Sequence, residues 1–132
     1  MKIGIFGVGS FGEKHISVLQ DIKNFNIIGF FDPDEKRANE IQNTFNIKLF
    51  NNPLTLIKSC EAIDIVSDTD THYELIKLGI KHNKHIFVEK PICCTQMEVN
   101  RLIQKCENYK SILQVGHIER YNPIIKEKIE KL

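Results

Sequence analysis

Three glycines follow a short apolar run near the amino terminus, in the stretch GIFGVGSFGEKH that begins at Gly4. Gly7, Gly9 and Gly12 have the G-x-G-x-x-G spacing of a loop that cradles the phosphates of a dinucleotide. The first glycine of such a loop permits a tight turn, the second lets the backbone approach the pyrophosphate, and the third lets helix and strand pack closely. The spacing alone also fits an ordinary glycine-rich turn, so its interpretation depends on the surrounding residues.

An acidic residue stands where a dinucleotide-binding loop needs one. Asp32 follows the apolar run NIIGFF and lies 20 residues after Gly12. A carboxylate there accepts hydrogen bonds from the ribose hydroxyls and repels a 2′-phosphate, which favours NAD over NADP. Arg37, one turn into the next helix, is the residue that would accommodate NADP. The alternative is that Asp32 is only a turn residue in the stretch FDPDE, but its distance from the glycines favours the cofactor role.

Short apolar runs alternate with segments of helical period along the chain. The runs are nearly continuous in isoleucine, valine and phenylalanine, as in strands that are buried on both faces. They are Lys2–Phe6, Asn26–Phe31, Ala62–Val66, His85–Val88 and Ser111–Val115, with a weaker run at Ile47–Phe50. The alternation predicts an α/β fold with a doubly wound parallel sheet, the Rossmann NAD(P)-binding fold, in one domain over residues 1–132.

Apolar stripes at helical spacing predict the helices between these strands. The first helix opens near Ser10. The expected inner faces are Phe11, His15, Val18, Leu19 and Ile22; then Ala38, Ile41 and Phe45; then His72, Ile76, Gly79 and Ile80; then Val99, Leu102, Ile103 and Cys106. Asn122 and Pro123 predict the N-cap and first residue of a last helix, which would carry Ile125, Ile129 and Leu132 on one side.

Composition and charge argue against several classes of function. The chain has 18 basic and 17 acidic residues, a formal net charge of +1, which gives no long-range field toward nucleic acid or a membrane surface. No apolar stretch reaches the length of a membrane span. Glycines also break the apolar stretch within residues 1–10, so these residues do not have the apolar region of a signal peptide. The four cysteines form no C-x-x-C pair. We therefore expect reduced thiols in a cytoplasmic protein and no metal site. A redox pair formed by the adjacent Cys93 and Cys94 is the alternative.

Three further motifs lie at the carboxyl ends of later strands, the edge at which open α/β sheets bind ligands. They are VSDTDTHYE at 66–74, FVEKP at 87–91 and VGHIERYNP at 115–123. With the glycine loop and GFFDPD, in this order, they make the chain resemble the Gfo/Idh/MocA family, the glucose–fructose oxidoreductase and inositol dehydrogenase group, over essentially its whole length. The most specific motif is EKP, which follows the fifth predicted strand if the weak run at Ile47–Phe50 is counted as a strand.

The resemblance implies an N-terminal Rossmann domain that binds NAD or NADP and a C-terminal substrate domain, which we expect to be absent from these 132 residues. The implied function is the nucleotide-binding domain of an oxidoreductase that acts on a hydroxyl or carbonyl of a sugar, cyclitol or nucleotide sugar. The alternative is a truncated NAD-binding module or partner subunit without turnover. The implied ligands are a dinucleotide and, where a substrate domain is supplied, a small sugar-like substrate. Ile124, Ile125 and Ile129 predict a homo-oligomer or a partner chain held through residues 118–132.

The family's lysine in EKP lies near the nicotinamide and the reacting oxygen, so Lys90 is the predicted catalytic residue. A solvated surface lysine is the alternative, although Pro91 restricts its backbone. Glu89 is expected to be a structural carboxylate or one that tunes that lysine, with a catalytic base as the alternative. The predicted cofactor-binding residues are Gly7, Val8, Gly9, Ser10, Phe11, Gly12, Asp32, Arg37, Ser67, Asp68, Thr69, His72, Glu89 and Lys90. His117 and Arg120 either contact substrate or nicotinamide, or anchor the turn before Asn122.

One stretch departs from the family's pattern. Where the family usually reads threonine–proline–threonine, this chain has Ser67, Asp68 and Thr69. A proline would stiffen a loop over the dinucleotide, whereas Asp68 adds flexibility and negative charge, so we expect it to weaken NAD binding. His72 and His15 lie on the inner faces of their helices, where a histidine is more often a core residue than a catalyst.

Overall fold

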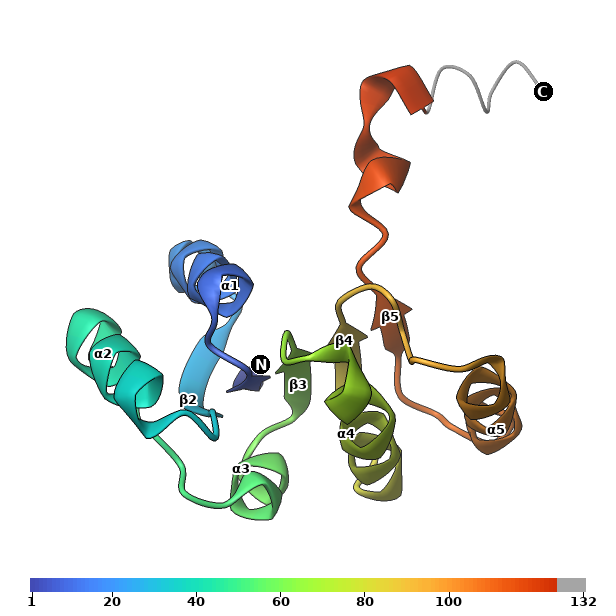
Figure 1. Cartoon of the computed structure of the whole chain (residues 1–132), viewed down its shortest axis with the longest axis horizontal. Coiled ribbons are helices and arrows are strands. Elements are labelled where there is room, and N and C mark those ends of the chain that lie inside the picture. Colours follow the sequence, from blue (N-terminus) through green and yellow to red (C-terminus); the bar gives the residue numbers. More distant parts are fainter. Residues whose placement is uncertain (126–132) are drawn as a thin grey trace.

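The computed structural model describes residues 1–125, and a parallel sheet runs through the middle of this part of the chain (Figure 1). Its strands are β1 (Lys2–Phe6), β2 (Asn26–Phe31), β3 (Ala62–Ile65), β4 (His85–Val88) and β5 (Leu113–Val115). Their order is β2-β1-β3-β4-β5, and each neighbouring pair is parallel. The predicted α/β fold with a doubly wound parallel sheet is confirmed.

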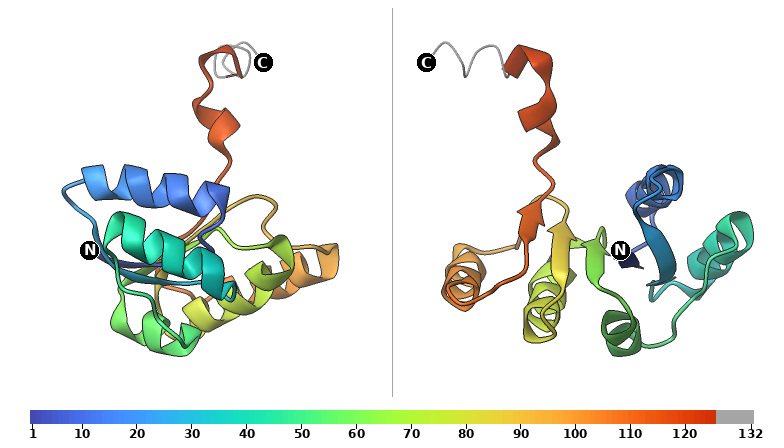
Figure 2. Two further views of the ribbon diagram at one scale, coloured as in Figure 1. Left: turned by 60° about the vertical axis from the view of Figure 1, so that its left-hand side comes forward. Right: turned by 180° about the vertical axis from the view of Figure 1, so that it is seen from behind.

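Helices cover both faces of the sheet, as Figure 2 shows from two further sides. They are α1 (Ser10–Asp21), α2 (Glu35–Phe45), α3 (Pro53–Ser59), α4 (Thr69–Lys81) and α5 (Gln96–Cys106), followed by the 3₁₀ turn η1 (Ile118–Tyr121). On one face, Ile16 of α1 and Ile41 of α2 pack with Ile5 and Phe30. On the other face, α3, α4 and α5 bury the larger cluster that contains Leu56, Ile76 and Leu102.

The predicted strand at Ile47–Phe50 is wrong except for one isolated bridge, between Phe30 and Leu49. A helix that the stripes did not predict, α3, follows immediately. The Asn52 side chain accepts hydrogen bonds from the first-turn amides of α3, and Pro53 occupies its first position. This helix start ends the extended stretch, so EKP follows the fourth strand of the sheet and not the fifth.

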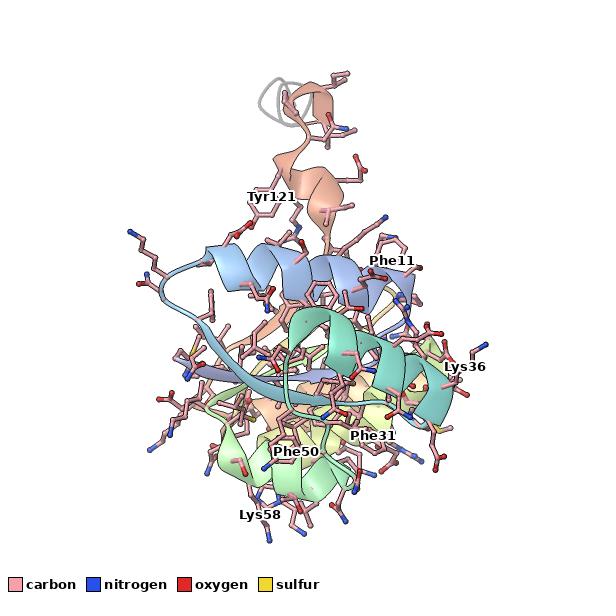
Figure 3. The ribbon with its side chains drawn as sticks, turned by 90° about the vertical axis from the view of Figure 1, so that its left-hand side faces the viewer. Phe11, Phe31, Lys36, Phe50, Lys58 and Tyr121 are labelled. Carbon is pink, nitrogen blue, oxygen red and sulfur yellow. The ribbon has the colours of Figure 1, made fainter. Side chains whose placement is uncertain are left out.

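The inner face predicted for α1 is also wrong at several positions. Phe11 and Val18 are 57% and 60% exposed, while the buried residues of the helix are Gly12 and Ile16. Figure 3 labels Phe11 on α1, above the sheet. A Cβ atom at Gly12 would lie 2.1 Å from the carbonyl oxygen of Gly7, so the helix rests on this glycine. The observed buried face is shifted by about one residue from the predicted stripe, because the helix packs through Gly12 and Ile16 and not through the larger Phe11 and Val18.

The segment after β5 leads away from the sheet (Figure 1). Asn122 Oδ1 accepts a hydrogen bond from the backbone N–H of Ile124 at 3.1 Å, and residues 123–125 are helical, as the N-cap prediction requires. Ile118, Tyr121 and Ile124 are exposed. Ile129 and Leu132 lie outside the described residues, so the predicted self-association remains a prediction. Within residues 1–125, none of the helices has both the length and the apolar character to cross a membrane.

Candidate functional site

The glycine loop lies where the strand order reverses, between the carboxyl ends of β1 and β3. In open α/β sheets this switch point forms the ligand crevice. Gly7 has φ +88°, and a Cβ atom there would lie 2.5 Å from the backbone nitrogen of Ser67. The Gly7 N–H donates to the carbonyl of Phe31 at 3.0 Å, and the Val66 N–H donates to that of Phe6 at 2.8 Å. The loop is therefore fixed between the ends of three strands.

Gly9 has a different reason to be glycine. A Cβ atom built on it meets nothing within 4 Å, and its φ of −60° is ordinary. Gly9 is the N-cap of α1, and no side chain caps this end of the helix. The first backbone amides of α1 are therefore free to bind a ligand, and the positive end of the helix dipole lies at the same place. Val8 before it is buried, whereas Ser10 and Phe11 after it are exposed. The start of a helix with free amides favours an anion such as a pyrophosphate, and a side chain at position 9 would stand beside it.

Asp32 holds the glycine loop from the end of β2. Its Oδ2 accepts the backbone N–H of Val8 at 2.7 Å, and its Oδ1 accepts that of Asp34 at 2.9 Å. A carboxylate offers about four lone-pair sites, so each oxygen still has acceptor capacity for a hydroxyl group. The sequence placed Asp32 at the correct strand end, and its bond to the loop is an additional contact.

Arg37 also contacts the loop, but the protein already neutralises its charge. Its Nε donates to the carbonyl of Val8 at 2.8 Å. The guanidinium pairs with Glu13 of α1 and, at 3.4 Å, with Glu40. The hydrogen bond to Glu13 is the main cause that raises the pKa of Arg37. The cation is thus held by carboxylates on two helices.

The loop after β3 borders the crevice and begins α4. Asp68 is the N-cap of α4, is exposed, and makes no capping hydrogen bond with its side chain. Ser67 Oγ lies 2.6 Å from Thr71 Oγ1. Thr69, the first residue of α4, is half-buried.

His72 lies behind the site. Its side chain is buried, with Nε2 2.9 Å from the carbonyl oxygen of Ser67 and Nδ1 3.0 Å from that of Pro91. Both ring nitrogens of His72 thus face backbone carbonyl oxygens. The ring connects the loop after β3 to the EKP segment.

Lys90 is exposed at the carboxyl end of β4. Its backbone N–H donates to Glu89 Oε2 at 3.1 Å, and the Lys90–Pro91 peptide is cis. The Lys90 side chain makes no hydrogen bond or ion pair within residues 1–125. Glu89 is half-buried, and its Oε1 lies 3.5 Å from His15 Nε2.

His117 and Arg120 lie on the segment that leaves the sheet. Both are exposed, and their backbone amides close the turn through bonds to Val115 and His117 carbonyls at 2.8 and 3.0 Å. Neither side chain forms a hydrogen bond or ion pair with another of the described residues. The structure does not bring them onto the glycine loop.

Two carboxylates at the site escaped the sequence reasoning. Glu13 neutralises Arg37, and Asp64 lies in the middle of β3, only 2% exposed, 2.9 Å from His15 Nδ1. Asp64 carried a signal, because a charged residue interrupts the buried run AIDI. A cavity of about 620 Å³ with mostly apolar walls reaches this pair from the α1 face of the sheet, away from the glycine loop.

Comparison with known proteins supplies a family match. The model of the family described as oxidoreductase family, NAD-binding Rossmann fold, matches residues 1–117. UDP-N-acetylglucosamine 3-dehydrogenase of Acidithiobacillus ferrooxidans is 29% identical over 126 residues, which are 96% of this chain and 40% of that protein. Myo-inositol 2-dehydrogenase of Thermotoga maritima is 30% identical over 130 residues, 96% of this chain and 39% of that protein. The chain spans about 40% of the length of these relatives.

Solved structures agree with the fold. The structure of the Acidithiobacillus ferrooxidans enzyme superposes with a TM-score of 0.89 at 27% identity, over 99% of this chain and 43% of that one. Scyllo-inositol dehydrogenase of Lactobacillus casei, solved with bound NAD(H) and scyllo-inositol, gives a TM-score of 0.89 at 20% identity, over 99% of this chain and 41% of that one. At that identity the second likeness concerns the fold alone.

Proposed function

Since this chain belongs to the Gfo/Idh/MocA oxidoreductase family, whose members have an NAD-binding Rossmann fold, we propose that residues 1–132 act as the NAD-binding domain of a dehydrogenase. The proposed reaction oxidises a hydroxyl, or reduces a carbonyl, of a sugar, cyclitol or nucleotide sugar. The matched relatives named above act on substrates of this kind. Because the chain covers about 40% of their length, the reaction is proposed for the whole protein and not for these residues alone.

One observation carries the dinucleotide proposal: Gly9 has open space beside the start of α1, while Gly7 and Gly12 are required by the chain's own packing. In the proposed complex, the backbone amides of Gly9, Ser10 and Phe11 hold the pyrophosphate. Ser67, Asp68 and Thr69 border the same crevice from the other side of the switch point. Gly7, Val8, Gly12 and His72 act indirectly, by fixing the two loops.

The arrangement around Asp32 supports NAD over NADP. Each Asp32 oxygen accepts one backbone N–H and retains a lone pair for a ribose hydroxyl. A 2′-phosphate would meet this negative charge. Arg37, the cation that would neutralise such a phosphate, is already paired with Glu13 and Glu40.

The reacting end of the proposed site is at the EKP segment. When bound, NAD supplies the acceptor for a hydride that leaves the substrate carbon. Lys90 would hold or move the proton at the reacting oxygen through its exposed Nζ. Glu89 fixes the backbone of Lys90. His117 and Arg120 are proposed as substrate contacts from the segment after β5.

Isothermal titration of the 132-residue chain with NAD, and separately with NADP, tests the proposal. We expect saturable binding of NAD and weaker binding of NADP. Binding of neither dinucleotide to the folded chain would overturn the proposed function. Turnover against a panel of polyols and nucleotide sugars then distinguishes a dehydrogenase from an NAD-binding module or partner subunit.

A further inference from the structure

A histidine flanked by two carboxylates lies between α1 and the sheet. His15 Nδ1 is 2.9 Å from Asp64 Oδ2, and His15 Nε2 is 3.5 Å from Glu89 Oε1. Ionised carboxylates only accept hydrogen bonds, and an imidazole donates from both nitrogens only when it is protonated. The two contacts therefore match the imidazolium form. Both carboxylates raise the pKa of His15, and the hydrogen bond to Asp64 is the largest cause.

A positive charge on His15 offsets the cost of burying the Asp64 carboxylate. Its side chain is buried, and its Oδ1 has no hydrogen-bond partner among the described residues. A buried carboxylate without a counter-charge is strongly unfavourable, and removal of one partner from a buried pair leaves that cost uncompensated. Burial raises the pKa of Asp64, and the contact with His15 opposes this effect.

Glu89 connects this pair to the predicted catalytic lysine. Its Oε1 faces His15, while its Oε2 accepts the backbone N–H of Lys90 at 3.1 Å. A Cβ atom on Gly116 would lie 2.8 Å from the same Oε1, so the residue that follows β5 lies against the carboxylate. The ring of Phe87, just before this segment, lies 5.8 Å from that of His15. His15 thus contacts residues on both sides of the end of β4.

We propose that His15 is a positioning residue for Lys90. Its protonated ring, anchored by Asp64, fixes the Glu89 carboxylate, and this carboxylate fixes the backbone of Lys90. The inference rests on the proposed role of Lys90 at the reacting centre. When His15 loses its proton, Glu89 loses its cationic partner, and the Lys90 backbone is held less firmly by the Glu89 carboxylate.

The other titratable groups on this side of the sheet do not compete with His15 for the two carboxylates. Lys14 of α1 and His85 of β4 line the same cavity as His15 and Asp64. Neither forms an ion pair with Asp64 or Glu89 within residues 1–125. Gln114, the polar residue that β5 contributes to the cavity, is neutral.

An NMR pH titration of the full chain tests the inference without any dinucleotide. We expect the His15 ring to titrate above the ordinary histidine value of about 6.5. The backbone amides of Lys90 and Gly116 should shift with the same midpoint. Asp64→Asn should lower the midpoint of His15, and His15→Gln should abolish the shift of the Lys90 amide. His82→Gln, a histidine change outside the cluster, should leave both signals unchanged.

Two outcomes would overturn the proposal: a His15 midpoint at or below the ordinary value, or a Lys90 amide that does not follow His15. If the variants fail to fold, the wild-type titration alone decides. A chain that shows the coupling but does not bind NAD contradicts the proposed function and leaves the His15–Glu89 linkage established. The two failures are therefore distinguishable.

Discussion

The backbone N–H of Val8 donates to Asp32 Oδ2 at 2.7 Å, so the glycine loop is tied to the end of β2 by the same carboxylate that is proposed to read the ribose. The Asp32 side chain thus fixes the conformation of the glycine loop and also offers acceptors to a ribose. A substitution of Asp32 affects both roles, so a second variant is needed to tell the two effects apart.

Asp32→Ala should lower NAD affinity by about 10–100-fold, since hydrogen bonds to a charged group contribute about 1.5–3 kcal/mol. The preference for NAD over NADP should also relax because a negative charge is lost. Asp32→Asn is the matched control, since it keeps an acceptor for the Val8 N–H but removes the charge. Titration calorimetry with both dinucleotides measures the effect. A wild-type chain that binds NADP more tightly than NAD would contradict the role of Asp32.

Gly9→Ala and Gly12→Ala should separate ligand binding from folding. Alanine at position 9 meets no neighbour and has an ordinary backbone angle, so we expect a free energy of unfolding within about 1 kcal/mol of wild type and a large loss of NAD affinity. Alanine at position 12 would collide with the Gly7 carbonyl and should destabilise the fold by about 1–3 kcal/mol or more. Urea unfolding and NAD titration give both quantities. Unchanged NAD affinity in Gly9→Ala would remove the main support for the phosphate site.

Asp68→Pro should tighten NAD binding. Asp68 has φ −62° and makes no capping bond with its side chain, so proline fits its backbone and should add about 0.4–1 kcal/mol of stability through the unfolded chain. The change also removes a negative charge beside an anionic ligand. Asp68→Asn removes the charge alone and so separates the two causes. Equal or weaker NAD affinity in a folded Asp68→Pro chain would contradict the expectation that Asp68 weakens the site.

The stability of the chain should depend on pH through His15. Because the folded-state pKa of His15 is raised, the protonated ring binds its proton more tightly in the folded than in the unfolded chain. This contribution is fully present below the unfolded value of about 6.5 and is lost as the pH rises through the raised folded value. The urea midpoint should therefore fall over that interval in wild type. His15→Gln should flatten this part of the curve, and an unchanged slope would argue against the pair with Asp64.

Lys90→Ala should separate chemistry from binding. In the 132-residue chain it should leave NAD affinity nearly unchanged, because Lys90 is proposed to act at the reacting end and not at the loops that would hold the dinucleotide. In the whole protein, kcat should fall by about 10²–10⁴-fold. Lys90→Arg should not restore it, since a guanidinium stays protonated at neutral pH. Lys36→Ala, an exposed lysine on α2 (Figure 3), is the control. Normal turnover in Lys90→Ala would make it a surface residue.

The strands of the sheet were predictable because each is a short, nearly continuous apolar run, the pattern of a strand buried on both faces. The position of Asp32 followed from spacing alone. The helix α3 was not predicted, although Asn52–Pro53 is the same start signal that identified Asn122–Pro123. The helix α3 has only seven residues, Pro53 included, too few for a clear apolar stripe.

The contacts among charged groups could not be predicted from the sequence. His15, Asp64 and Glu89 are separated by 49 and 25 positions, and only the folded chain brings their side chains together. Arg37 was considered as a ligand for NADP, and its pairing with Glu13 depends on how α1 and α2 lie side by side. Residue propensities and the spacing of apolar residues indicate helices and strands, whereas the partners of a charged side chain depend on the tertiary arrangement.

The open space beside Gly9 has an evolutionary consequence. Gly7 and Gly12 are retained by any lineage that keeps this fold, because a side chain at either position collides with the backbone. At position 9 a side chain meets no neighbouring atom, so a substitution of this glycine would not disturb folding. In a descendant that had stopped using the dinucleotide, position 9 would be the first of the three to drift.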